Sequence, residues 1–247
     1  MTKASPSILV VDDEVDTCRN LSDILTDLGY HVDMAFDGFA ALELARKKRY
    51  DIALLDLKMP GMDGLTLYRE LRQICAETVA IVVTAYASKA MAEEALAAGA
   101  WQVLPKPVDF PRLMNLVIEA LCQPLVLIVD DDPDLCSNLW DVLRDREYRV
   151  AIAHDEDNAG RLLAEHQFQA VLIDMKLPRG DGRSVFQRVR KTNPQARTVV
   201  ITGHRAEMDP VIQRVMTEGA DAVCYKPFDV PNLLATLEQL TSSETRP

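Results

Sequence analysis

The chain has 247 residues, of which 48% are hydrophobic and 26% are charged, and its net charge is −11. This composition is typical of a folded globular protein, and the acidic balance argues against intrinsic binding to nucleic acid or anionic lipid, because phosphate groups require clustered Lys and Arg. The five cysteines form no CxxC pair, the N-terminus has no signal-peptide pattern and no apolar run could span a bilayer, so we expect a cytoplasmic protein with reduced thiols.

The first half of the chain alternates short apolar runs with helical patterns. The runs lie at 8–11, 31–35, 52–55, 79–83 and 101–104. Because they are rich in β-branched residues, they predict strands that are covered on both faces, as in a parallel sheet. The helix after the first run is indicated by an apolar stripe at three-to-four spacing, formed by Val15, Cys18, Leu21, Leu25 and Leu28. Gly29 and Gly99 are expected at the C-terminal ends of helices.

The second half of the chain repeats the first. ILVVDDEVD, at 8–16, returns as VLIVDDDPD at 126–134, and DIALLDLKMPGMDG, at 51–64, returns as QAVLIDMKLPRGDG at 169–182. VVTA and LPKPVDFP likewise return as VITG and CYKPFDVP. A repeat of about 120 residues is a duplicated domain rather than a solenoid unit. We therefore expect two α/β domains, residues 1–122 and 123–247, each with a doubly wound five-stranded parallel sheet.

Two Asp-Pro pairs in the second half are expected to start helices. Asp132 followed by Pro133, and Asp209 followed by Pro210, have the pattern of a capping residue with proline in the first turn.

The polar residues that repeat all follow predicted strands. In the first half they are Asp12, Asp13, Asp56, Thr84 and Lys106, and in the second half Asp130, Asp131, Asp174, Thr202 and Lys226. Because the carboxyl ends of parallel strands form the functional crevice of an open α/β sheet, we expect each set to meet in one pocket. Three carboxylates there repel one another unless a proton or a cation relieves them, and their hard oxygen atoms suit Mg²⁺. An Asp beside positive groups is suited to attack phosphorus, because carboxylates form aspartyl phosphates.

Each half of the chain resembles the receiver domain of bacterial two-component response regulators, which has a chemotaxis-regulator-like, flavodoxin-like fold. The resemblance covers about residues 5–122 and 124–242 and rests on motifs that are specific in combination. They are VVDDE, LLDLKMPGMDG, VVTA and LPKP in the first half and IVDDD, LIDMKLPRGDG, VITG and YKPF in the second.

The resemblance implies a role for each repeated residue. Asp56 and Asp174 would be the phosphoacceptors. Mg²⁺ would be bound by Asp13 and Asp131 directly, by Asp12 and Asp130 through water, and by the backbone carbonyls of Lys58 and Lys176. Thr84 and Thr202 would hydrogen-bond the phosphoryl group, and Lys106 and Lys226 would pair with it. The peptide bonds before Pro107 and Pro227 would be cis.

The resemblance also implies partners and a mode of action. A sensor histidine kinase or a phosphotransfer protein would donate the phosphoryl group, and the chain, with no output domain, would act as a switch or phosphorelay carrier through an effector that the sequence leaves unknown. No dedicated enzyme is expected beyond Mg²⁺-dependent self-phosphorylation and autodephosphorylation. Tyr86 and His204, two residues after each Thr, could tune the access of water to the phosphoryl group or be exposed loop residues.

The sequence departs from the family pattern at one place. Receivers often have Tyr or Phe three residues before the Lys, and rotation of that ring reports phosphorylation on the far face. Here Val103 and Val223 stand at those positions, and Tyr225 adjoins Lys226 instead. How the signal leaves either domain is therefore open.

Several other functions compete with this interpretation. One domain could be phosphorylated while its twin serves dimerisation, which leaves a homodimer open, or the chain could be the receiver part of a longer output protein. A dehalogenase-type phosphatase requires a second Asp two residues after the nucleophile, where Lys58 and Lys176 stand here. A dinucleotide-dependent oxidoreductase requires a GxGxxG after the first strand, which neither half has.

Overall fold

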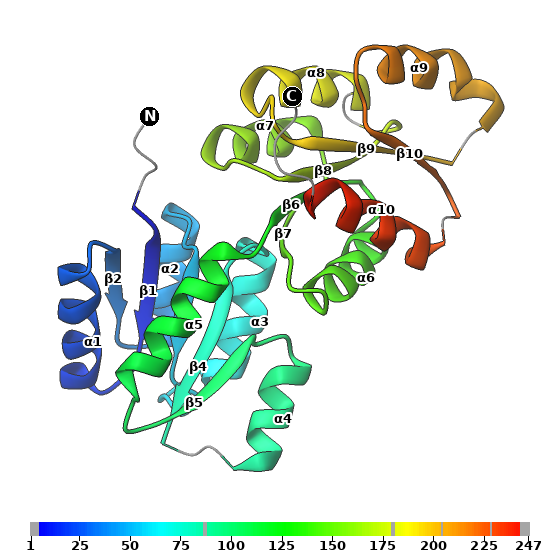
Figure 1. Cartoon of the computed structure of the whole chain (residues 1–247). Helices are drawn as coiled ribbons and strands as arrows, with labels where there is room; N and C mark the ends of the chain where they lie inside the picture. The colour runs from blue at the N-terminus through cyan, green and yellow to red at the C-terminus, as the bar shows by residue number, and fades with distance from the viewer. Residues whose placement is uncertain (1–4, 86–87, 179–180, 204, 228, 243–247) are drawn as a thin grey trace. The chain divides into compact units, whose positions relative to one another are not determined.

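The chain divides into two compact units, Met1–Gln123 and Pro124–Pro247, called domain 1 and domain 2 below. The computed structural model (Figure 1) describes residues 5–85, 88–178, 181–203, 205–227 and 229–242, with the backbone alone for 205–209. In these residues no helix is long and apolar enough to cross a membrane.

Domain 1 alternates five strands with five helices. In chain order they are β1 (Ser7–Val11), α1 (Val15–Asp27), β2 (His31–Ala35), α2 (Gly38–Lys47), β3 (Ile52–Leu55), α3 (Gly64–Ile74), β4 (Val79–Thr84), α4 (Lys89–Ala97), β5 (Gln102–Pro105) and α5 (Phe110–Cys122).

Domain 2 repeats this order. Its elements are β6 (Leu125–Val129), α6 (Pro133–Arg144), β7 (Arg149–Ala153), α7 (Glu156–Glu165), β8 (Ala170–Asp174), α8 (Gly182–Thr192), β9 (Arg197–Thr202), α9 (Arg205–Thr217), β10 (Ala222–Tyr225) and α10 (Val230–Ser242).

Each domain contains one five-stranded parallel sheet, as the alternation of runs and helices predicts. The strand order is β2-β1-β3-β4-β5 in domain 1 and β7-β6-β8-β9-β10 in domain 2, so the chain reverses direction across the sheet at β1/β3 and at β6/β8. The pairs are all parallel and in register, with Val11 beside Leu55 and Val129 beside Ile173. Such a reversal opens a crevice at the carboxyl ends of the two central strands, which is where the repeated acids follow.

The central strands are buried and the edge strands β2, β5 and β10 are partly exposed, whereas the edge strand β7 is almost wholly buried. Strands β1, β3, β4, β6 and β8 are almost wholly buried, as expected for strands covered on both faces. The expectation is wrong for β2, where His31 is exposed and Met34 is 38% exposed, and it holds only in part for β5; both strands lie at a sheet edge. The stripe on α1 is likewise shorter than predicted: Cys18, Leu21 and Leu25 are buried, whereas its two end residues, Val15 and Leu28, are 38% and 55% exposed.

The surfaces of the two domains differ where the first helix approaches the last. In domain 1 the positions are held by Leu28 and Ile118, which are 55% and 52% exposed. In domain 2 the corresponding residues are Arg146 and Glu238, whose Nη1 and Oε1 atoms lie 2.6 Å apart. The duplication has therefore kept the core and changed this surface from apolar to ionic.

Helix ends follow the predicted signals with one exception. Gly29 and Gly99 have φ of +91° and +110°, the left-handed conformation that ends a helix. The Asp132 carboxylate accepts hydrogen bonds from the backbone N–H groups of Asp134 and Leu135, as a cap before Pro133 should. The prediction for Asp209 is wrong, because α9 already begins at Arg205 and contains Pro210 in its interior.

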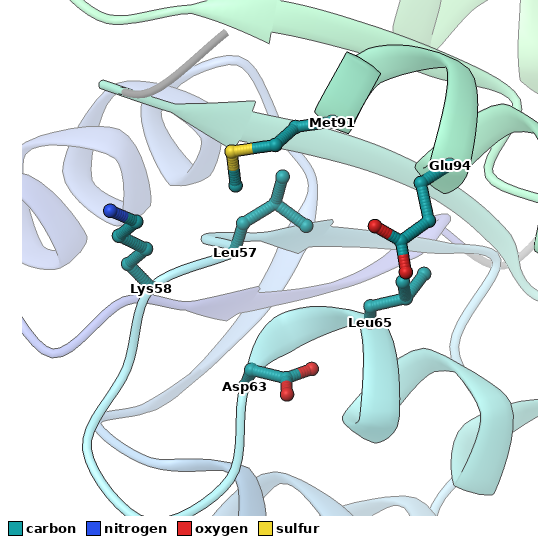
Figure 2. A pocket seen from close by; sticks show the side chains of 6 residues that line it. All are labelled: Leu57, Lys58, Asp63, Leu65, Met91 and Glu94. Atoms are coloured by element: carbon teal, nitrogen blue, oxygen red, sulfur yellow. The ribbon is translucent and has the colours of Figure 1, made fainter. Parts of the chain in front are cut away.

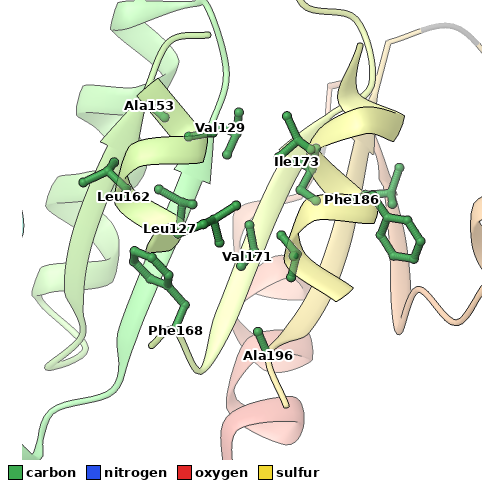
Figure 3. Packing of buried hydrophobic residues seen from close by; sticks show 14 of the residues in the cluster. Leu127, Val129, Ala153, Leu162, Phe168, Val171, Ile173, Phe186 and Ala196 are labelled. Carbon is green, nitrogen blue, oxygen red and sulfur yellow. The ribbon is translucent and has the colours of Figure 1, made fainter. Parts of the chain in front are cut away.

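The cores lie on the faces of the sheets. Figure 3 shows one face of the domain 2 sheet, where Leu127 and Val129 of β6 lie near Leu162 of α7, and Ile173 of β8 lies near Phe186 of α8, within one cluster. These side chains are all buried, and burial of a side chain of this size stabilises a fold by about 1.5–3 kcal/mol.

One glycine in each domain lets a helix begin against the loop that carries the third acid. A Cβ atom built on Gly64 would overlap the backbone carbonyl oxygen of Asp56, and one on Gly182 would overlap that of Asp174. The helices α3 and α8 can approach these loops because there is no side chain at their first residue.

We predict that Gly182→Ala destabilises domain 2 by about 2 kcal/mol, since overpacking against a backbone carbonyl cannot be relieved by rotation of a side chain. Guanidinium denaturation measures this in a Trp101→Phe background, where Trp140 fluorescence reports domain 2 alone. Gly203→Ala is the matched control, because a Cβ there would lie 3.9 Å from the Lys226 Cβ, an ordinary contact. Equal denaturation midpoints for the two variants would contradict the prediction.

Candidate functional site

The backbone at the carboxyl edge of each sheet positions the repeated acids. Asp12 follows β1, and its N–H donates to the carbonyl of Ala35 at 3.2 Å. Asp56 follows β3, and its N–H donates to the carbonyl of Val11 at 2.9 Å. The parallel ladder thus continues by one residue past the strands and fixes both acids at the same edge.

In domain 1 three carboxylates meet at this edge. One oxygen atom each from Asp12, Asp13 and Asp56 lies within 4.8 Å of the others. Asp12 and Asp56 are buried, at 3% and 7% exposure, whereas Asp13 is exposed. Hard oxygen ligands that converge from an open side fit a divalent cation such as Mg²⁺, which keeps part of its water shell.

The Lys106 side chain joins the same cluster from the end of β5. Its Nζ lies 2.6 Å from Asp12 Oδ2 and 3.3 Å from Asp56 Oδ2. The Lys106 N–H donates to the carbonyl of Thr84 at 2.9 Å, and the Lys106–Pro107 peptide bond is cis, as the family resemblance implies. The sequence predicts this Lys beside the phosphoryl acceptor but does not predict that its shorter contact is with Asp12.

Domain 2 assembles the same groups. Asp130, Asp131 and Asp174 each place a carboxylate oxygen within 4.8 Å of the other two. Lys226 Nζ lies 2.6 Å from both Asp130 Oδ2 and Asp174 Oδ2, and the Lys226–Pro227 bond is cis. The acid and lysine positions predicted from the sequence therefore come together in both domains.

The threonines and the lysines after the acceptors take less central places. Thr84 and Thr202 are buried at the ends of β4 and β9, at 0% and 2% exposure. The side chains of Lys58 and Lys176 are exposed. Their N–H groups point back to the acids, Lys176 N lying 2.9 Å from Asp174 Oδ1 and Lys58 N 3.5 Å from Asp56 Oδ1. Tyr86 and His204 lie outside the described residues.

Two backbone donors were missed from the sequence. The N–H of Glu14 donates to Asp12 Oδ1 at 3.0 Å, and the N–H of Asp132 donates to Asp130 Oδ1 at 3.0 Å. Each bond orients the first acid of its cluster. A backbone N–H is present at every residue except proline, so the sequence carries no signal for it.

Burial and charge act in opposite directions on the paired groups. Burial raises the pKa of Asp12 and Asp130, and the hydrogen bonds from Lys106 and Lys226 only partly offset it. Burial alone would lower the pKa of Lys106, but its bonds with Asp12 and Asp56 outweigh that effect, so the pKa is raised. The clusters therefore hold charged carboxylates at a cost that their lysines do not fully remove.

The positions of the usual aromatic reporter pack into the domains. Val103 lies beside Val82 of β4 and packs on a small cluster that includes Leu57 and Ala95. Val223 lies beside Val200 of β9. Neither side chain has a ring that could rotate between two positions.

The family model for the response regulator receiver domain matches the chain twice, at residues 8–118 and 126–238. A response regulator receiver protein of Anaeromyxobacter sp. (strain Fw109-5) is 37% identical over 232 residues, which is 94% of this chain and 94% of that protein.

Other relatives match one domain's length only. The transcriptional regulatory protein ZraR of Salmonella typhimurium is 39% identical over 121 residues, 49% of this chain and 27% of that protein. Sporulation initiation phosphotransferase F of Bacillus subtilis is 34% identical over 110 residues, 44% of this chain and 89% of that protein.

We predict that the protein binds two Mg²⁺ ions and that Asp13→Asn and Asp131→Asn each abolish one of them. Both acids are exposed members of their clusters, so their loss removes a ligand without opening the core. Isothermal titration measures the stoichiometry, and Asp16→Asn, an exposed acid on α1 outside the cluster, should leave it unchanged. A stoichiometry of two in both variants would contradict the assignment.

We also predict that Asp12→Asn stabilises the metal-free protein, so that the unfolding midpoint of domain 1 rises. The raised pKa of Asp12 means that its charged form is less favourable in the folded than in the unfolded chain. This deficit is present at pH 7 and disappears as the pH falls below the ordinary pKa of Asp. Circular dichroism melts in EDTA at several pH values measure it. A lower midpoint for the variant at pH 7 would mean that the Lys106 bond outweighs the burial.

Proposed function

Since the chain belongs to the response regulator receiver family in both of its halves, we propose that it is a two-component response regulator with two phosphoacceptor domains, residues 1–122 and 123–247. Asp56 and Asp174 are the proposed acceptors. The observation that carries this proposal is the convergence of three carboxylates and one lysine at the carboxyl edge of each sheet.

The proposed reaction transfers a phosphoryl group to a carboxylate. An oxygen of Asp56 attacks phosphorus and the bond from phosphorus to the donor's imidazole nitrogen breaks. That nitrogen keeps the electron pair of the broken bond, and the other ring nitrogen carries the proton of the neutral imidazole that leaves. A small acyl phosphate can replace the phosphohistidine, in which case a phosphorus–oxygen bond breaks. Mg²⁺ held by Asp12, Asp13 and Asp56, with the Lys58 carbonyl, would supply neutralisation of charge on the phosphoryl oxygens.

Lys106 and Thr84 are the proposed ligands of the product. Lys106 Nζ already lies 3.3 Å from Asp56 Oδ2, so it can follow the phosphoryl group with a small movement. Thr84 ends the neighbouring strand and offers a hydroxyl donor. In domain 2 we assign the same roles to Lys226 and Thr202.

Phosphorylation would act by changing charge at a site that is already crowded with it. An aspartyl phosphate carries close to two negative charges and strong acceptor oxygens. Lys106 then has a stronger partner than Asp12, and exchange of its 2.6 Å contact biases the domain between two conformations. With Val at 103 and 223, the proposed output is movement of the backbone after β4 and β9 rather than rotation of a ring.

The proposed partners are a histidine kinase or phosphotransfer protein as donor and an effector protein as receiver of the signal. Two acceptors in one chain make both a double switch and a phosphorelay carrier feasible. The alternative, in which only one domain is phosphorylated and the other is a docking surface, gives a different stoichiometry.

We predict that incubation with Mg²⁺ and acetyl phosphate adds up to two phosphoryl groups, because the two sites have the same groups. Intact mass spectrometry should show at most one in Asp56→Asn and in Asp174→Asn, and none in the double variant. Asp23→Asn, an exposed acid on α1, is the control and should retain both.

An unmodified wild-type chain would contradict the proposal. Modification of the wild type at one acceptor only would favour the alternative in which the twin domain is a docking surface.

A further inference from the structure

A groove of about 270 Å³ lies in domain 1 beside the acceptor loop, between that loop, the start of α3 and helix α4 (Figure 2). None of the three acids of the carboxylate cluster lines it, although Lys58, whose backbone carbonyl is a proposed metal ligand, does. Its lining residues are of two kinds, three apolar and three charged: Leu57, Leu65, Met91, Lys58, Asp63 and Glu94.

The groove is apolar in the middle and acidic at one end. Figure 2 shows Leu57 and Met91 between Lys58 on one side and Glu94 on the other. Leu57 is buried and belongs to the small cluster on which Leu65 and Met91 pack, so these three side chains form a well-packed floor of the groove. The two carboxylates exceed the one ammonium group, and in the part of the chain that the structure describes Glu94 forms no ion pair. A ligand that matches this lining has an aliphatic stem and a cationic head.

Domain 2 has different residues at the positions that correspond to the domain 1 groove. Leu65, one residue after the glycine that begins α3, corresponds to Arg183, and Ala98, one residue before Gly99, corresponds to Glu218. Arg183 Nη2 lies 2.8 Å from Glu218 Oε1 and so links the start of α8 to the end of α9. Arg214, at the position of Glu94, adds a second guanidinium 3.3 Å from the same carboxylate.

The two domains therefore carry opposite charges at this position. Domain 2 supplies two guanidinium groups and the Glu218 carboxylate that receives them, and it also has an acid, Asp181, at the position of Asp63. Domain 1 differs in having Glu94 where domain 2 has Arg214, and Leu65 where domain 2 has Arg183. Arginine suits such a site better than lysine, because its planar fork can serve two carboxylates and its head is weakly hydrated.

We propose that the domain 1 groove binds an arginine side chain presented by a partner protein, with the stem on Leu57, Leu65 and Met91 and the guanidinium at Glu94 and Asp63.

The probe is the blocked tripeptide acetyl-Ala-Arg-Ala-amide, which has no charge other than its guanidinium. It is titrated into the full chain with labelled Met and Leu methyl groups, without Mg²⁺ or any phosphoryl donor. The Met91 methyl signal should shift and saturate with a dissociation constant on the order of 1 mM. The same peptide with citrulline should bind about tenfold more weakly, because it lacks the charge-assisted hydrogen bonds.

Matched variants locate the site. Glu94→Gln should weaken binding of the peptide about tenfold. Glu93→Gln is the control and should not change the affinity, because Glu93 pairs with Lys89 outside the groove. The double variant Leu65→Arg/Ala98→Glu, which installs the domain 2 pair, should abolish the Met91 shift while methyl signals elsewhere stay in place.

Three results would overturn the proposal: no Met91 shift at about 50 mM peptide, well above the expected constant; equal affinity for the citrulline peptide; or binding of the small cation agmatine without binding of the peptide. Because these titrations contain no phosphoryl donor, their failure would leave the phosphoacceptor assignment standing. Likewise, failure of the phosphorylation experiment would not contradict the arginine-binding groove.

Discussion

Repulsion among three carboxylates is the constraint on which each domain depends. The parallel sheet brings them together because the strands that precede them end at the same edge, and the hydrogen bond from Asp56 N–H to Val11 holds that edge in register. Two of the three acids are buried, so their charge cannot be left to solvent. A single lysine that follows the last strand offsets part of it at 2.6 Å. In the function proposed above, the remaining negative charge would bind a cation, which in turn would bind the phosphoryl group.

The duplication separates what this chemistry requires from what it does not. Acids, threonine, lysine, cis peptide bonds and the glycine under each helix start are the same in both domains. Surfaces away from the cluster differ in kind. Leu28 and Ile118 face solvent where Arg146 and Glu238 pair, and Leu65 stands where Arg183 bridges two helices. The proposed reaction would thus take place in two domains with different surfaces, and a partner protein that contacts these surfaces could tell the domains apart.

The sequence predicted the elements, and which acids and lysine meet at each sheet edge, because both depend on strong local signals. Buried parallel strands are continuous apolar runs, and residues after strand ends must meet at one edge, so Asp12, Asp56 and Lys106 were found together as expected. Exposure at the ends of elements was not predictable from periodicity. The apolar runs do not reveal that β2 is a sheet edge, and the apolar stripe on α1 does not reveal that its two end residues are exposed. The prediction of a helix start at Asp209 was wrong, because a proline after Asp is common at helix starts but can also be accommodated inside a helix, as Pro210 is. The Glu14 and Asp132 amides carry no sequence signal, and the domain 1 groove depends on the distance between α4 and the acceptor loop.

The glycines at the start of α3 and α8 have a mechanical consequence. The first residue of each helix is in direct contact with the acceptor's backbone carbonyl, so no gap between them can absorb a displacement of the loop. The loop and the helix must then move together. Any motion of the Asp56 or Asp174 backbone toward the helix therefore also shifts the far end of that helix, on the opposite side of the domain.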